Sequence, residues 1–148
     1  MFVTNPIAIL GEQEAAKILE SKGFRIVERN WRMGHLEIDL IAENRKEIVF
    51  AEVKARTSTF GNIMPEQYVD EPKRQRMVVA ANAYIKYHRT DKKPRFDIIG
   101  LLINSETQEI TYRCHLENAF VPHQRTISTN SYSGQWRWPH RNHTTEKK

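Results

Sequence analysis

The sequence has almost no cysteine and no long apolar run. Cys114 is the single cysteine among 148 residues, which excludes an intramolecular disulfide and any Cys-x-x-Cys zinc or redox motif. The first residues, MFVTNPIAIL, lack the basic stretch and the long apolar core of a signal peptide. No run approaches the roughly 20 apolar residues that span a bilayer. These absences predict a cytoplasmic protein that has no membrane partner.

An excess of one charge sign is also absent from most of the chain. Residues 1–120 hold 18 Lys and Arg against 17 Asp and Glu, whereas residues 121–148 hold five against one. We therefore expect one domain over residues 1–120, followed by a basic tail over residues 121–148. Ser, Thr, Asn, His and Arg dominate the tail, which predicts disorder. Its Trp and Arg side chains could stack on single-stranded bases, and a solvated extension is the alternative.

Hydrophobic periodicity predicts two helices and five strands. Asn5 and Gly23 suit the two ends of a first helix, and Asp70 suits the start of a second. The expected helices cover residues 7–22 and 71–89. The expected strands cover residues 24–32, 35–42, 48–56, 95–103 and 109–116. This order predicts an α/β fold in which helices cover a central sheet.

The second and third predicted strands read as a hairpin. In the first of them the apolar side chains occupy the even positions, Leu36, Ile38, Leu40 and Ala42. Strict alternation predicts that these four share one face. A two-residue loop at Arg45 and Lys46 makes the numbers of opposed residues sum to 91, which sets Asp39 opposite Glu52. A slip of two residues along either strand would keep the same faces.

Two carboxylates on adjacent strands raise a chemical question. Bare, Asp39 and Glu52 would repel each other, and one of them would take up a proton. A divalent cation removes this conflict, since Mg²⁺ is typically held by one or two carboxylates together with water and phosphate oxygens. Lys54 points to the same side as Glu52, where an ammonium can orient water or stabilise phosphate charge. The alternative is a salt-bridged cluster on a partly exposed sheet face.

Several ordered segments resemble known proteins. The spacing of Asp39 and Glu52-Val53-Lys54, after a helix that bears Glu12, resembles the PD-(D/E)XK nuclease core of the restriction-endonuclease-like fold. More closely, the chain resembles the YraN-like family of bacterial proteins over about residues 11–120. Five segments carry that resemblance: GEQEAAKILESKGFRIVERNWR, GHLEIDLIA, VFAEVKAR, PEQYVDEPK and RFDII. The resemblance implies an αβββαβ core with a mixed central sheet.

The resemblance also implies roles for individual residues. It implies catalytic roles for Asp39, Glu52, Lys54 and Glu12. The first two would be ligands of Mg²⁺ or Mn²⁺, and Lys73 would be a basic residue that faces the site. Arg56 lies in a basic cluster with Lys54 and is expected to contact nucleic acid. A helix-surface role for Glu12 and plain solvation for Lys73 are the alternatives.

Two functional hypotheses follow. The first is a metal-dependent endonuclease that hydrolyses phosphodiester bonds in DNA, branched or structured DNA included. The second is a non-catalytic accessory protein that binds nucleic acid in recombination or repair. In both, the partner is nucleic acid, DNA before RNA, and a homodimer is allowed. Asp97 is expected to be structural and bonded to a backbone group, and Glu37 to pair with a lysine or to lie at the edge of the site.

Overall fold

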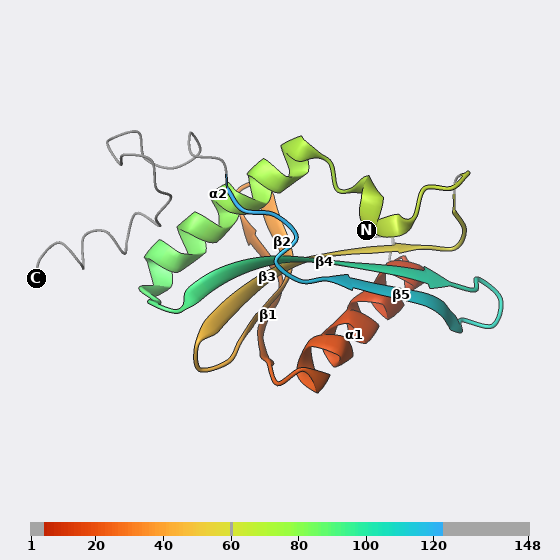
Figure 1. Cartoon of the computed structure of the whole chain (residues 1–148), viewed down its shortest axis with the longest axis horizontal. Helices are drawn as coiled ribbons and strands as arrows, with labels where there is room; N and C mark the ends of the chain where they lie inside the picture. Colours follow the sequence, from red (N-terminus) through yellow and green to blue (C-terminus); the bar gives the residue numbers. More distant parts are fainter. Residues whose placement is uncertain (1–4, 60, 123–148) are drawn as a thin grey trace, which may run out of the picture.

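The chain forms a five-stranded mixed sheet between two long helices. The computed structural model describes residues 5–59 and 61–122. In chain order the elements are α1 (Pro6–Ser21), β1 (Arg25–Met33), β2 (Leu36–Glu43), β3 (Glu47–Arg56), the 3-10 helix η1 (Pro65–Tyr68), α2 (Glu71–His88), β4 (Lys93–Ile103) and β5 (Ile110–Leu116). Figure 1 shows α1 and α2 on opposite sides of the sheet. The predicted restriction-endonuclease-like fold is confirmed, and the strand and long-helix bounds differ from the predicted ones by at most two residues.

The strands lie in the sheet in the order of the sequence, β1-β2-β3-β4-β5. Neighbouring strands are antiparallel except β3 and β4, which are parallel because the intervening α2 returns the chain across one face. Between β2 and β3 the pairs run from Leu40 with Ala51 to Glu43 with Ile48, and their numbers sum to 91. The register predicted for this hairpin is therefore confirmed over the paired residues.

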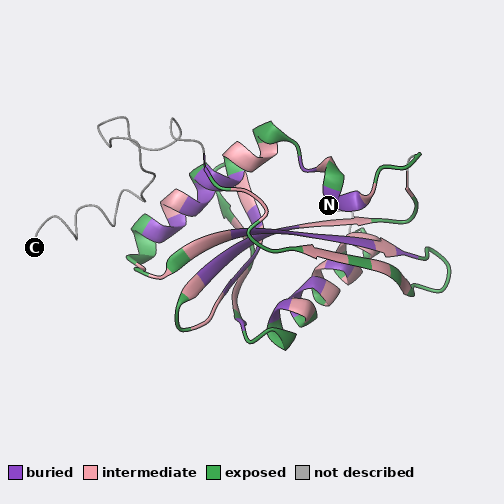
Figure 2. Ribbon diagram, in the orientation of Figure 1, coloured by how far each residue is buried: buried purple, intermediate pink, exposed green. Residues whose placement is uncertain are grey.

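Apolar side chains fill a separate core on each face of the sheet. On one face Phe50 and Phe96 pack against Met77, Tyr84 and other residues of α2. On the other face β2, β3 and β4 pack against Ala15, Ala16 and Leu19 of α1. Figure 2 shows that burial is greatest along the central strands. In the described part of the chain, no helix is long and apolar enough to cross a membrane.

The first helix lies unusually close to the sheet. Asn5 begins it as predicted, because its side-chain oxygen accepts hydrogen bonds from the main-chain N–H groups of Ile7 (3.0 Å) and Ala8 (3.3 Å). A Cβ atom at Gly11 would stand 2.6 Å from the Cβ of Ala55. Only glycine therefore permits this distance between α1 and β3. The next residue along the helix is Glu12.

One prediction about β2 is wrong. Leu40 and Ala42 do pack on the α1 face, but Leu36 and Ile38 pack in the core beneath α2. The pairs between β2 and β3 end at Leu40, so the earlier half of β2 pairs only with β1. A two-stranded ribbon twists more strongly than a wide sheet, which turns these side chains toward the other layer.

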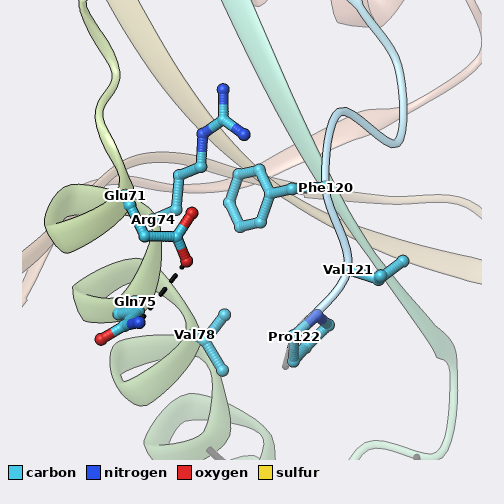
Figure 3. Close-up of a pocket in the computed structure, with 7 residues that line it drawn as sticks. All are labelled: Glu71, Arg74, Gln75, Val78, Phe120, Val121 and Pro122. Atoms are coloured by element: carbon cyan, nitrogen blue, oxygen red, sulfur yellow. Dashed lines mark hydrogen bonds between the residues drawn. The ribbon is translucent and has the colours of Figure 1, made fainter. Parts of the chain in front are cut away.

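The segment after β5 folds back onto α2. Phe120 stacks on Phe96 of β4, with 5.0 Å between ring centroids, and the Arg74 guanidinium lies 5.4 Å from the Phe120 ring centroid. Figure 3 shows the shallow pocket that this segment forms with α2, lined also by Glu71, Gln75, Val78, Val121 and Pro122. Pro122 is buried, and the domain boundary at residue 120 stays a prediction. The rest of the predicted tail lies outside the described residues.

Candidate functional site

The candidate site lies at the fork where β2 and β3 separate. Their last pair is Leu40 with Ala51, while β3 continues alongside β4 as far as Arg56. Beyond that last pair the main-chain N–H of Val53 bonds a side chain of β2 instead of its main chain: it donates to Oδ2 of Asp39 at 2.8 Å. This bond holds the Asp39 carboxylate at the fork, beside Glu52.

Glu52 is the most buried member of the site, with 4% of its surface exposed. Lys73 of α2 places its Nζ 3.4 Å from Oε1 of Glu52, and Lys54 places its Nζ 3.9 Å from Oε2. The Lys73 contact is an ion pair that lacks hydrogen-bond alignment. Oε1 of Glu52 is buried and has no hydrogen-bond partner among the described residues. A buried oxygen without a hydrogen bond lowers the stability of the fold unless a ligand or cation binds it.

The two carboxyl groups resist ionisation. Burial raises the pKa of Asp39, while the Val53 N–H and the Lys73 charge oppose the rise. Burial, and then the charge of Asp39, raise the pKa of Glu52 from 4.5 to about 7, against the lowering effect of Lys73 and Lys54. Glu52 therefore holds a proton more readily than an exposed glutamate does when no cation is bound.

Two further acidic residues border this pair. Glu12 accepts a hydrogen bond from the Asn30 side chain at 3.2 Å, and burial followed in smaller measure by the charge of Asp39 raises its pKa. Glu37 pairs with Arg32 at 3.5 Å rather than with a lysine. Its charge also acts on Asp39, so it lies at the edge of the site.

The other predicted site residues differ in how close they lie to Glu52. Lys73 faces Glu52 directly, whereas the exposed Arg56 lies over the Tyr68 ring at 5.4 Å and bonds the Ala55 carbonyl. Across residues 5–59 and 61–122, no group of three or more His, Cys, Asp or Glu side chains is arranged to hold a metal ion. Glu12 therefore does not join Asp39 and Glu52 as a third ligand.

The donor set limits the chemistry that the site can support. Two carboxylates, one of them with an unpartnered buried oxygen, supply the hard oxygen donors that suit a divalent cation such as Mg²⁺. The adjacent Lys54 and Lys73 ammonium groups supply positive charge at the same place. Anionic ligands with oxygen atoms, phosphates among them, fit such a site.

Sequence reasoning missed the contribution of Val53. Its role comes from a main-chain N–H, and no side-chain pattern reveals which N–H a fork leaves unpaired. By contrast, Asp97 is structural as expected. It is fully buried and accepts bonds from the Asn118 N–H (3.0 Å) and from the Arg95 side chain (2.8 and 2.9 Å), and it pairs with His115 (2.7 Å).

Comparison with known proteins identifies the family. The model of the uncharacterised protein family UPF0102 matches residues 11–101. A UPF0102 protein of Bacteroides thetaiotaomicron is 41% identical over 118 residues, which cover 80% of this chain and 94% of that protein. One from Caldanaerobacter subterraneus subsp. tengcongensis is 41% identical over 116 residues (77% and 93%), and one from Lawsonia intracellularis is 35% identical over 127 residues (85% and 93%). The chain therefore belongs to the UPF0102 family, which is the YraN-like family that its sequence motifs resemble.

Proposed function

We propose that this protein is a metal-dependent phosphodiesterase that cleaves nucleic acid internally, with DNA, including branched or structured DNA, as its substrate. One observation carries the proposal. The fork between β2 and β3 gathers two carboxylates whose pKa values are raised and two lysines, and it leaves Oε1 of Glu52 without a hydrogen bond. A purely structural ion pair would satisfy both carboxylate oxygens.

A divalent cation fits this pair of carboxylates. Asp39 and Glu52 would hold it, and its charge would relieve their repulsion and satisfy the buried Oε1 of Glu52. Bound Mg²⁺ or Mn²⁺ supplies a Lewis acid that polarises a phosphate oxygen. Burial of Glu52 keeps bulk water away from its carboxylate, so its interaction with positive charge is strong.

The basic residues act on the phosphate and on the attacking water. Lys54 lies 3.9 Å from Glu52, so its ammonium can orient a water molecule and stabilise negative charge that develops on the phosphate. Lys73 approaches the same carboxylate from α2 and is placed to bind a phosphate oxygen. Arg56 is exposed at the end of β3, and in this proposal it contacts the adjoining backbone phosphate.

Cleavage of defined DNA substrates tests the proposal. Duplex, single-stranded and four-way-junction DNA are incubated with the protein and Mg²⁺, Mn²⁺ or EDTA. We expect cleavage with either metal and none with EDTA. Glu52→Gln and Lys54→Met should each reduce the rate by at least a hundredfold. Lys86→Met, in the exposed last turn of α2, is the matched control and should cleave at the wild-type rate.

A second readout does not depend on activity. Mg²⁺ should raise the melting temperature of the wild type but not that of Glu52→Gln, because only the former offers both carboxylates. Binding of DNA without cleavage under every metal condition would contradict the phosphodiesterase. That result would favour the non-catalytic accessory protein.

A further inference from the structure

A second buried carboxylate lies on the sheet near the candidate site. Glu66 belongs to η1, and 9% of its surface is exposed. The Tyr112 hydroxyl on β5 donates to its Oε2 at 2.8 Å, and this bond raises the pKa of Tyr112. The residues between β3 and α2 have the sequence pattern of a loop, so neither η1 nor the burial of this carboxylate was predicted.

A glycine in the sheet makes room for this carboxylate. A Cβ atom at Gly100 would stand 2.4 Å from Oε1 of Glu66 and 2.9 Å from its main-chain nitrogen. No other residue could occupy position 100 without displacing Glu66. The carboxylate therefore rests directly on the backbone of β4.

This position is next to Lys54. Gly100 pairs laterally with Lys54 in the parallel ladder of β3 and β4, where neighbouring strands are about 5 Å apart. Four residues earlier, the laterally paired Phe50 and Phe96 both point into the core beneath α2. Since side chains alternate along a strand, Lys54 and the Glu66 carboxylate lie on that same face.

The Glu66 carboxylate is not fully satisfied. Its Oε1 is buried and makes no hydrogen bond within the part of the chain that the structure describes. The neighbouring Cys114 thiol interacts with the carboxylate, but a thiol is only a weak donor. An apolar side chain at position 66 would pack over Gly100 without this cost. The retained carboxylate therefore points to a cationic partner.

We infer that Glu66 is a positioning residue for Lys54, whose ammonium moves from Glu52 to the free Oε1 of Glu66 when a cation occupies the Asp39 and Glu52 pair. The inference rests on the proposed function, in which Lys54 acts on phosphate. The Lys54 ammonium lies 3.9 Å from Glu52, so a cation held there would repel it. Glu66, on the adjacent strand, supplies the acceptor that keeps Lys54 charged and beside the phosphate rather than in solvent.

A mutant cycle tests this without metal or substrate. Glu52→Gln removes the competing carboxylate, so Lys54 should pair with Glu66 in this background. Adding Glu66→Gln, which keeps the side-chain shape and the bond from Tyr112, should then lower the melting temperature by roughly 2–5 °C more than it does when Lys54→Met is also present. Equal shifts with and without Lys54 would overturn the inference. Lys86→Met in the same background is the control and should leave the Glu66→Gln effect unchanged.

A crystal structure of Glu52→Gln gives a direct check. It should place Lys54 Nζ within about 4 Å of Oε1 of Glu66, the limit for an ion pair. A Lys54 side chain directed into solvent would contradict the inference even if the variant folds normally.

Kinetics separate this inference from the proposed function. If the protein cleaves DNA, Glu66→Gln should reduce kcat about 10–100-fold and leave KM within about twofold, the effect of losing a partner that orients a catalytic group. A raised KM with unchanged kcat would contradict a positioning role. If the wild type cleaves no substrate, the proposed function fails, and the mutant cycle alone decides whether Glu66 holds Lys54.

Discussion

The Glu52 carboxylate is buried, with 4% of the residue exposed, and the carboxylate of Asp39 lies beside it. In the folded protein its pKa is about 7, against 4.5 in the unfolded chain. Below pH 4.5 the group is neutral in both states and costs nothing. As the pH rises from 4.5 to about 7 the unfolded chain ionises freely while burial opposes ionisation in the folded protein, so stability falls across this range and levels off above it.

We therefore predict that Glu52→Gln stabilises the metal-free protein in a pH-dependent way. The gain should stay below about 1 kcal/mol at pH 5 and reach about 1–3 kcal/mol at pH 8, less than the full shift implies because Lys54 and Lys73 lose their ion pairs. Urea unfolding at pH 5, 6, 7 and 8 in EDTA measures it. Glu106→Gln, on the exposed β4–β5 turn, should show no such trend. An equal gain at every pH would show that Glu52 ionises normally.

At the scale of single residues, the sequence predicts which side chains come together but not which main-chain groups contribute to the site. Asp39 and Glu52 could be predicted to converge, because alternation and hairpin length set which residues oppose each other. The Val53 N–H and the space above Gly100 could not be predicted, since both depend on where strands separate and how closely η1 approaches. Glu66, which looks like any loop glutamate in the sequence, is buried for that reason.

Among the elements, α1 depends on the smallest side chain at its contact with β3. We predict that Gly11→Ala destabilises the protein by about 1–2 kcal/mol, although alanine favours helix by about 1 kcal/mol. The new Cβ would lie 2.6 Å from the Cβ of Ala55, which forces the helix away from the sheet. Chemical denaturation measures the loss.

Two companion variants make this prediction specific. Ala55→Gly should restore part of the stability of Gly11→Ala, because it removes the atom that the new methyl meets. Gln13→Ala, on the exposed side of the same helix, should change stability by less than about 0.5 kcal/mol. Failure of Ala55→Gly to restore any stability would mean that the clash is not the cause.

The last two strands are tied together by Asp97. We predict that Asp97→Asn lowers stability by about 2–4 kcal/mol at pH 7, because Arg95 loses its main partner and keeps the weaker contacts with Glu47 (3.3 Å), Glu117 (3.6 Å) and the Phe24 ring (5.0 Å). Hydrogen bonds from His115 and Arg95 lower the pKa of Asp97. Its contribution is therefore present above pH 3.8 and is lost as the pH falls through the lowered folded value.

Urea unfolding between pH 3 and 7 checks this. The difference between wild type and Asp97→Asn should narrow toward pH 3, because below pH 3.8 the unfolded wild-type chain takes up a proton that the folded carboxylate resists. Mg²⁺ binding should persist in the variant, since Asp97 makes no contact with Asp39 or Glu52 in the described hydrogen bonds and ion pairs. A constant difference across this pH range would refute the ionic origin of the effect.

Element order and type could be predicted from the sequence because each helix and strand follows a simple period. Two features depend on tertiary context instead. The face of Leu36 and Ile38 depends on the twist of a ribbon that only two strands form. The 3-10 helix η1 is four residues long, too short for a period to show. Both departures lie beside the candidate site.

At the scale of the whole molecule, a truncation can separate the described domain from the basic end of the chain. The fold continues through Phe120 to the buried Pro122, so a truncation should end at residue 122 and not at 120. The chain that ends there should melt within about 2 °C of the full chain, because the Phe120 stack on Phe96 is kept. A loss of more than about 5 °C would mean that residues 123–148 contribute to the folded domain.

The same truncation tests whether the tail binds nucleic acid. Residues 123–148 carry five basic side chains, Arg125, Arg137, Arg141, Lys147 and Lys148. Each phosphate that they neutralise releases counterions, so log affinity for duplex DNA falls with log salt by about 0.9 per contact. If most of the five contact phosphate, residues 1–122 should bind more weakly than the full chain, and the slope should be flatter by roughly 2 to 4.

Affinity for one duplex at four or more salt concentrations measures both slopes, with Glu52→Gln in each chain so that cleavage does not interfere. Substrate preference in the active chains should be the same with and without the tail, because Asp39, Glu52 and Lys54 all lie in the domain. Equal slopes would show that the tail is a passive extension. A flatter slope with an unchanged preference would make it a non-specific electrostatic arm, since phosphate contacts set affinity and carry no sequence information.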